Sequence, residues 1–163
     1  DYVNHLQGLL LLHSTTYEDN EAKKTSRMKV AEFIQEWGVS KYLETATPNL
    51  FGDAFKKANP GVIQNVIDSG LGISQEAMIQ FVFAMRNRKA MTQLLQQNNM
   101  PVWMIVGEAD LAVTIQDSLE QIKLLPSSNS LVLKEVGHMG MLEATDLVNQ
   151  FIKKMLVGNN DAL

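Results

Sequence analysis

Two short turns of the sequence carry the residues best suited to chemistry. Asp110 and His138 each follow an apolar segment, and the glycines Gly107 and Gly137 lie close to them. A carboxylate can accept the ring N–H of a histidine, fix its tautomer and stabilise the imidazolium that forms when the ring takes a proton. Glycine lets the backbone turn sharply and expose its neighbours. The pattern predicts an acid–base pair in which Asp110 orients His138.

Two further residues are candidates for the border of a substrate pocket. His13 follows a run of leucines, and Met139 follows His138 directly. The alternative for His13 is a ring satisfied by local hydrogen bonds, and the alternative for Met139 is ordinary core packing. No His-x-x-x-His spacing occurs, so we expect no metal site, and the predicted chemistry requires no cofactor.

Three apolar segments are expected to form the strands that position these residues. They are residues 8–13, 101–107 and 130–136, and the last two end just before Asp110 and His138. The first two are continuous apolar runs, which is typical of parallel strands covered by helices on both faces.

Helical spacing of apolar residues follows the second and third strands, over residues 112–125 and 142–155. Strand, helix, strand, helix is the order of a parallel sheet joined by crossovers, so the fold class is α/β. Ligands of such sheets bind outside the carboxyl ends of the strands. We therefore expect Asp110 and His138 on the same rim of the sheet.

The long insert between the first two strands, residues 14–99, is expected to be helical throughout. Gly38 is a natural stop for its first helix, and Ser74 is a natural N-cap for a later one that buries Phe81 and Val82. An all-helical excursion between two parallel strands predicts a lid or cap over the carboxyl edge of the sheet.

At these segments the chain resembles the α/β-hydrolases. Residues 101–110 resemble their strand and acid turn, and residues 136–143 resemble their catalytic-histidine turn and the helix after it. Residues 8–14 are similar to the strand before the cap, and residues 84–88 to the last cap helix. The resemblance spans nearly the whole chain, and the acid precedes the histidine as in that family.

The resemblance implies a serine-type hydrolase of carboxylic esters or related acyl compounds, with Asp110 and His138 as the acid and histidine of its triad. Its partner would be a small ester-like molecule. The Gly-x-Ser-x-Gly nucleophile motif of the family lies upstream of the strand before the cap, and it does not occur in this sequence. We expect the chain to be the C-terminal part of a longer protein and to be inactive alone.

The resemblance also predicts the domain organisation. Residues 1–13 and 100–158 form a partial α/β-hydrolase core, residues 14–99 a helical cap, and residues 159–163 a tail. The edge of the first strand would normally pair with the strand that leads to the nucleophile. Left open, it predicts a homodimer or pairing with an N-terminal half.

Two other functions remain open at this point. One is a non-catalytic helical interaction module. The other is a hydrolase with a different upstream nucleophile, as in dehalogenases, epoxide hydrolases and perhydrolases.

Composition narrows the function classes further. The 163 residues carry a net charge of −4 with no block of Lys or Arg, so we expect no nucleic-acid partner. The apolar runs are far shorter than a membrane span, so no membrane partner is expected either. There is no cysteine for a disulfide framework. Cytoplasmic residence is the expectation.

Overall fold

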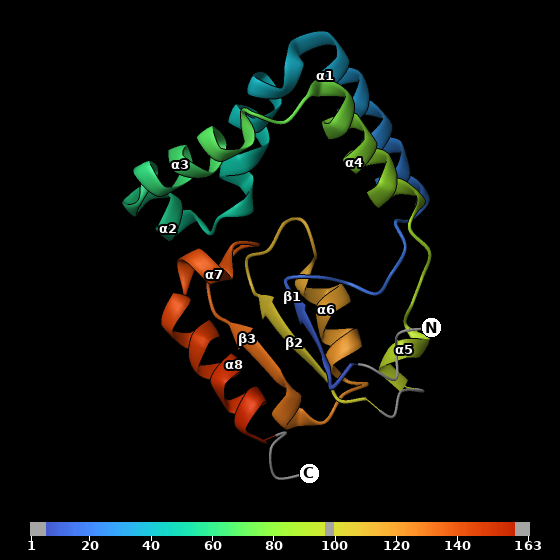
Figure 1. The fold of residues 1–163 in the computed structure, drawn as a ribbon, viewed down its shortest axis with the longest axis vertical. Coiled ribbons are helices and arrows are strands. Elements are labelled where there is room, and N and C mark those ends of the chain that lie inside the picture. The colour runs from blue at the N-terminus through green and yellow to red at the C-terminus, as the bar shows by residue number, and fades with distance from the viewer. Residues whose placement is uncertain (1–5, 97–99, 159–163) are drawn as a thin grey trace. The chain divides into compact units, whose positions relative to one another are not determined.

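The computed structural model describes residues 6–96 and 100–158, which divide between two compact units (Figure 1). Unit 1 comprises Asp1–Thr16, Leu50–Phe55 and Thr92–Leu163, and unit 2 comprises Tyr17–Asn49 and Lys56–Met91. Residues 50–55, which the sequence placed in the insert, therefore belong to the unit that contains the sheet. The expected tail lies outside the described residues.

The sheet of unit 1 has three parallel strands in the order β1-β2-β3. They are β1 (Leu9–Leu12), β2 (Val102–Gly107) and β3 (Ser130–Leu133). The predicted α/β fold with parallel strands is confirmed. The third strand ends earlier than the sequence indicated because Glu135 has φ 60°, a left-handed conformation that an extended strand does not contain.

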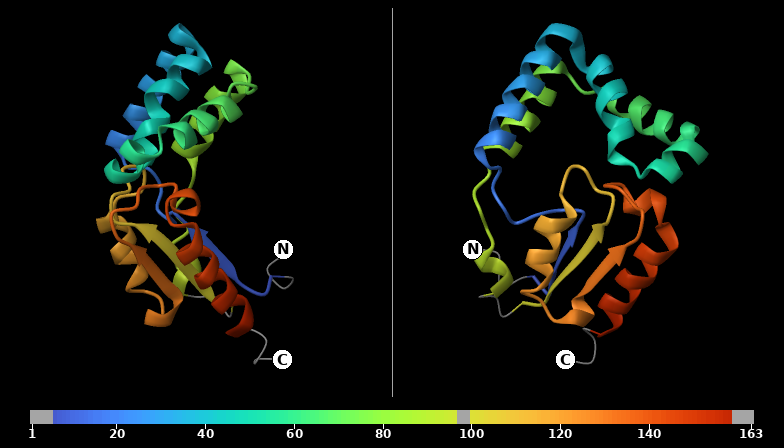
Figure 2. Two further views of the ribbon diagram at one scale, coloured as in Figure 1. Left: turned by 90° about the vertical axis from the view of Figure 1, so that its left-hand side faces the viewer. Right: turned by 180° about the vertical axis from the view of Figure 1, so that it is seen from behind.

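Helices cover both faces of this sheet, α6 (Ile115–Ile122) on one and α8 (Thr145–Gly158) on the other (Figure 2). On the α8 face, Ile105 and Leu133 pack with Val148. Every residue of β2 is buried, as its continuous apolar run predicted. The shorter elements of this part of the chain are α5 (Gln93–Gln96), η3 (Ser127–Asn129) and α7 (Gly140–Glu143).

The regular elements of unit 2 are all helices, and the main ones are α1 (Glu21–Ala46), α3 (Pro60–Gly70) and α4 (Gln75–Asn87). Gly38 interrupts α1 with φ 81°, where the sequence predicted a stop. The side chain of Ser74 caps α4 by accepting the N–H of Ala77 at 3.2 Å. Along the chain, two of the boundaries between the units fall within the short elements η2 (Thr47–Leu50) and α2 (Asp53–Ala58).

The core of unit 2 is the contact between α1 and α4. Ala31 and Ile34 of α1 are buried there with Met78 and Val82 of α4. The prediction that Phe81 is buried as well was wrong, since 58% of it is exposed. Met78 and Val82 are four residues apart and form one narrow stripe, and Phe81 lies beside this stripe.

A buried carboxylate joins the beginning of α1 to the end of α4. Asp19, which precedes α1, is fully buried and accepts hydrogen bonds from Arg27 at 3.0 Å and from Arg88, just after α4, at 2.7 Å. Burial alone would raise the pKa of Asp19, but the two guanidinium groups hold it below its ordinary value.

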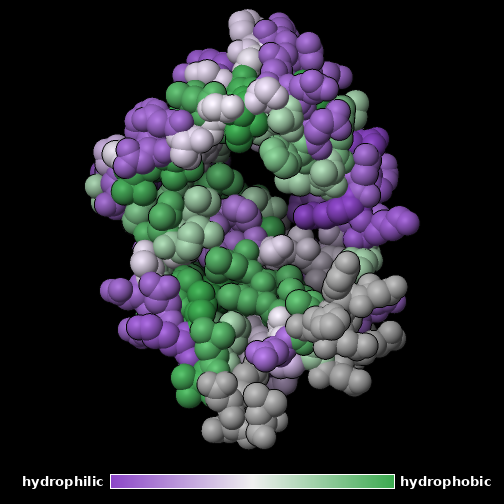
Figure 3. All heavy atoms as spheres, viewed as in Figure 1, coloured by the Kyte–Doolittle hydropathy of each residue, from purple (hydrophilic) through white to green (hydrophobic). Residues whose placement is uncertain are grey.

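The described sheet has β1 and β3 as its two edge strands, and the four leucines of β1 are all partly exposed. Figure 3 shows apolar side chains gathered on the visible face of unit 1. The pairing of the β1 edge with a second chain or an N-terminal half stays a prediction. None of the helices in the described ranges is long and apolar enough to cross a membrane.

Candidate active site

The carboxyl ends of all three strands lead into residues with polar side chains. His13 follows β1, Asp110 lies three residues after β2, and His138 lies five residues after β3. Because the strands are parallel, their carboxyl ends lie at the same rim of the sheet. The expected common rim for Asp110 and His138 is therefore present.

The Asp110 carboxylate is fixed by its own turn. Asp110 is 5% exposed, and its Oδ1 accepts the backbone N–H groups of Ala112 at 2.8 Å and Val113 at 2.9 Å. These bonds use one carboxylate oxygen and set the plane of the group. Oδ2 remains to accept a hydrogen bond from another element.

That second oxygen accepts from His138, whose Nδ1 lies 2.8 Å from Asp110 Oδ2. An ionised carboxylate only accepts hydrogen bonds, so Nδ1 of His138 must carry the proton. Nε2 is then the nitrogen free to take a proton. The His138 side chain is 29% exposed, so the ring is within reach of a small molecule.

The charge of Asp110 is stabilised in place. Burial by itself would raise the pKa of the carboxyl group, but the neighbouring imidazoles of His13 and His138 and the Val113 N–H hold the pKa well below its usual range. Asp110 is therefore ionised at neutral pH. It can stabilise a positive charge that forms on His138.

The turn that carries His138 is held by Glu143, to which the sequence assigned no role. Its two carboxylate oxygens accept the backbone N–H groups of Gly52 at 2.8 Å, Gly137 at 3.0 and 3.2 Å and Met139 at 3.3 Å. The available signal was a carboxylate five residues after the histidine, at the end of a short helix.

The segment Leu50–Phe55 also supports this turn. The N–H of His138 donates to the carbonyl of Leu50 at 2.7 Å. Phe51 is buried and stacks on Phe55 with ring centroids 5.7 Å apart. No local pattern in the sequence indicated that these residues would return to the histidine turn.

Glycine is needed at positions 107 and 137 for a different reason from the one predicted. Neither has a positive φ, so sharp turning is not what requires them. A Cβ on Gly107 would overlap the carbonyl oxygens of Val136 and Gly137, and a Cβ on Gly137 would lie 2.6 Å from the carbonyl oxygen of Leu50. Both glycines allow backbone segments to approach each other closely.

The two pocket candidates occupy different environments. His13 is buried beside Asp110, with Nδ1 3.7 Å from Oδ2, and neither ring nitrogen has a hydrogen-bond partner within 3.5 Å among the described residues. Met139 is partly buried at the start of α7. A role for either residue at the border of a substrate pocket stays a prediction.

No group of three or more potential metal ligands forms among the described residues, although Glu135 precedes His138 by the Glu-x-x-His spacing.

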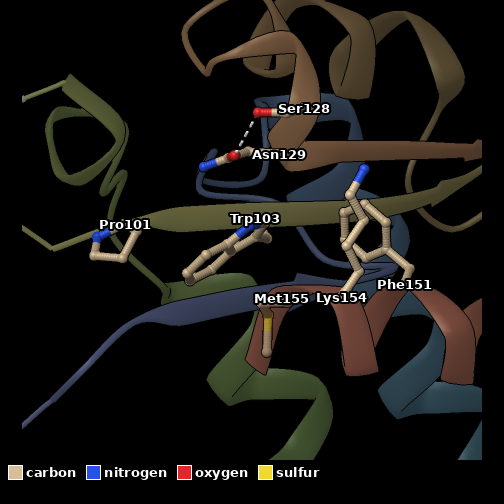
Figure 4. Close-up of a pocket in the computed structure, with 7 residues that line it drawn as sticks. All are labelled: Pro101, Trp103, Ser128, Asn129, Phe151, Lys154 and Met155. Carbon is tan, nitrogen blue, oxygen red and sulfur yellow. Dashed lines mark hydrogen bonds between the residues drawn. The ribbon is translucent and has the colours of Figure 1, made fainter. Parts of the chain in front are cut away.

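A pocket of about 330 Å³ occurs in unit 1 (Figure 4). It is lined by Pro101 and Trp103 at the start of β2 and by Phe151 and Met155 of α8. It lies at the opposite end of β2 from Asp110 and contains neither Asp110 nor His138.

Solved structures similar to this chain are α/β-hydrolases. A thermophilic esterase from Thermogutta terrifontis superposes with a TM-score of 0.86 at 24% identity, over 98% of this chain and 58% of the esterase. The enol-lactonase from Burkholderia xenovorans LB400 gives 0.80 at 15% identity, over 96% and 58%. Bromoperoxidase from Bacillus anthracis gives 0.72 at 15% identity, over 90% and 58%. No family model and no curated protein matches the sequence.

The chain therefore has the α/β-hydrolase fold, as its two turns indicated. It spans less than two thirds of the length of these structures, 58% in each of the three. At these identities the likeness establishes the fold, and the chemistry has to be argued from the site.

Proposed function

We propose that this chain supplies the acid and the general base of a serine-type hydrolase that acts on carboxylic esters or related acyl compounds. The observation that carries the proposal is the 2.8 Å hydrogen bond between Nδ1 of His138 and Oδ2 of Asp110. The esterase and lactonase among the similar structures support this substrate class.

Each group has a defined task in the proposed reaction. Nε2 of His138 takes the proton from the nucleophile hydroxyl as its oxygen attacks the acyl carbon, and then gives that proton to the departing alcohol. A water molecule repeats the sequence to release the acid. Asp110 keeps its charge throughout, holds the ring in the Nδ1–H tautomer and stabilises the imidazolium.

The nucleophile belongs, in this proposal, to a segment N-terminal to Asp1, so the 163-residue chain is inactive alone. An aspartate at that position would give dehalogenase or epoxide-hydrolase chemistry with the same acid–base pair. A serine with a different pocket would suit a perhydrolase-type reaction, an alternative supported by the bromoperoxidase among the similar structures. The identity of the upstream residue decides among these reactions.

The test is to express the reading frame with the coding sequence upstream of Asp1 and to measure hydrolysis of short p-nitrophenyl esters. His138→Ala is expected to lower kcat by about 10⁴-fold or more because it removes the general base. Asp110→Asn is expected to lower kcat by about 10⁴-fold because His138 loses the acceptor that fixes its tautomer. Lys123→Ala, at an exposed position of unit 1, is the control and should keep full activity. Full activity of His138→Ala would exclude the proposed reaction, and turnover by the 163-residue chain alone would exclude the missing-nucleophile part.

A further inference from the structure

His13 is a buried imidazole that the proposed reaction does not use. Its side chain is 1% exposed, and neither of its ring nitrogens has a hydrogen-bond partner among the described residues. A neutral imidazole carries one N–H, and a buried N–H without a partner is costly. The ring therefore needs an acceptor close by.

The nearest carboxylate is the one that His138 already uses. Nδ1 of His13 lies 3.7 Å from Oδ2 of Asp110, and Nδ1 of His138 lies 2.8 Å from the same oxygen. The two rings have centroids 6.0 Å apart and planes at 68°. A carboxylate oxygen has lone pairs for two donors, and a separation of 3.7 Å leaves no room for a water molecule in between.

The other ring nitrogen indicates where the proton lies. A Cβ added to Gly140 would overlap Nε2 of His13 and would lie 2.7 Å from Cε1, so the edge of the ring rests against the Cα–H of Gly140. An unprotonated nitrogen can accept a weak Cα–H contact, whereas an N–H pointing at Cα would have no acceptor. This arrangement favours the proton on Nδ1, toward Asp110.

The backbone at His13 is also held in an uncommon conformation. Its φ is 45°, in the left-handed region, and its N–H donates to the carbonyl of Ile105 at 2.8 Å. Histidine enters this region more readily than most residues, but the conformation persists only where the surroundings fix it. Thr16, three residues on, is bound twice by Gln121, at 2.8 and 2.7 Å.

Two other carboxylates of the neighbouring turns, those of Glu143 and Glu108, are occupied elsewhere. Glu143 binds the backbone N–H groups of the histidine turn, and Glu108 accepts the N–H of Glu135 at 3.4 Å. Asp110 is therefore the carboxylate available to both imidazoles.

We propose that His13 is a positioning residue whose Nδ1–H is the second donor to Oδ2 of Asp110, beside His138. Its catalytic meaning rests on the proposed function, whereas its geometry does not. With donors from Ala112, Val113, His138 and His13, the carboxylate is fixed on all sides. His138 then meets an acceptor that cannot rotate away when its ring becomes charged.

Nuclear magnetic resonance of the 163-residue chain labelled with ¹⁵N-histidine tests the tautomer directly. The chain has three histidines, and His5, outside the described residues, can be replaced by Gln so that two remain. Correlations between ring protons and ring nitrogens show which nitrogen is protonated. We expect His13 to be neutral with the proton on Nδ1. An Nε2–H tautomer or a fully protonated ring at neutral pH would overturn the proposal.

A matched pair of variants tests the effect on His138. His13→Asn retains an amide N–H close to the position of Nδ1, and His13→Leu has a similar shape without a donor. The Nδ1–H proton signal of His138 should be preserved in the Asn variant and shifted or broadened in the Leu variant. The same signal in both variants would overturn the proposal. The wild-type tautomer remains a test if either variant fails to fold.

Kinetics in the protein extended by its upstream segment separate this inference from the proposed function. His13→Leu should lower kcat about tenfold with KM nearly unchanged, and His13→Asn should restore most of the loss, as expected for one hydrogen bond to a charged group. An extended wild-type protein without hydrolase activity would count against the proposed function alone. Equal kcat in the wild type and His13→Leu would count against the role of His13.

Discussion

The two units of the chain are stabilised in different ways. In unit 1, carboxylates bind backbone N–H groups: the buried Asp110 binds its own turn, and the partly buried Glu143 ties the histidine turn to Gly52. In unit 2, an apolar stripe joins α1 to α4, and Asp19 binds two arginine side chains.

The difference follows from what each unit has to hold. Helices satisfy their own backbone groups, so two of them need only a shared apolar surface. The turns after parallel strands have no ladder partners, so side chains must bind their N–H groups. The residues that could do chemistry lie on these turns, and a carboxylate fixed from several sides can keep an imidazole in place.

The largest expected difference between the units concerns two glycines. Gly137→Ala in unit 1 would bring a Cβ against backbone atoms of Leu50 and Gly52 at 2.6 and 2.8 Å and should cost about 3 kcal/mol of unfolding free energy. Gly61→Ala in α3 of unit 2 has open space and should be neutral or stabilise by up to about 1 kcal/mol. Urea unfolding followed by Trp103 fluorescence, in a Trp37→Phe background, measures the first change, and amide exchange over α3 measures the second. Equal effects of the two substitutions would remove the contrast.

A smaller effect is expected from removing one hydrogen-bonded carboxylate in each unit, the partly buried Glu143 and the buried Asp19. Glu143→Gln places an amide NH₂ against backbone N–H groups, and Asp19→Asn leaves Arg27 and Arg88 without their anion. Each substitution should lower the free energy of unfolding by about 2 kcal/mol, in the range for hydrogen bonds to charged groups. Amide hydrogen exchange reads both units in one sample: the first variant should loosen residues 136–143 and the second residues 20–46. Loosening of the same segments by both variants would contradict separate stabilisation.

The smallest expected effect is the pH dependence. The folded-state pKa values of Asp19 and Asp110 lie below their ordinary value of 3.8. A carboxyl group with a lowered pKa contributes stability that is fully present above its unfolded value and is lost as the pH falls toward the folded value. Unfolding free energies should be level from about pH 7 to about pH 5 and fall below about pH 4. Asp19→Asn should reduce this acid sensitivity in unit 2 alone. A free energy of unfolding that rises on acidification would contradict the lowered pKa values of the two carboxyl groups.

Local patterns in the sequence predicted most of the secondary structure. The three strands, the break at Gly38 and the cap at Ser74 occur where composition and capping chemistry indicated them. Such features depend on residues within a few positions of each other, so a single segment contains the information. The burial of Phe81 could not be predicted in this way, because it depends on how much of α4 its neighbour α1 covers.

The sequence by itself determined the order of strands and helices and the presence of an acid before a histidine at two strand ends. Tertiary structure alone decided the contacts that make these residues a site. Glu143 binds Gly52 across 91 positions, and His13 reaches Asp110 from another strand. Periodicity and capping act over one or two turns of chain, whereas these contacts depend on which distant segments the folded sheet brings together.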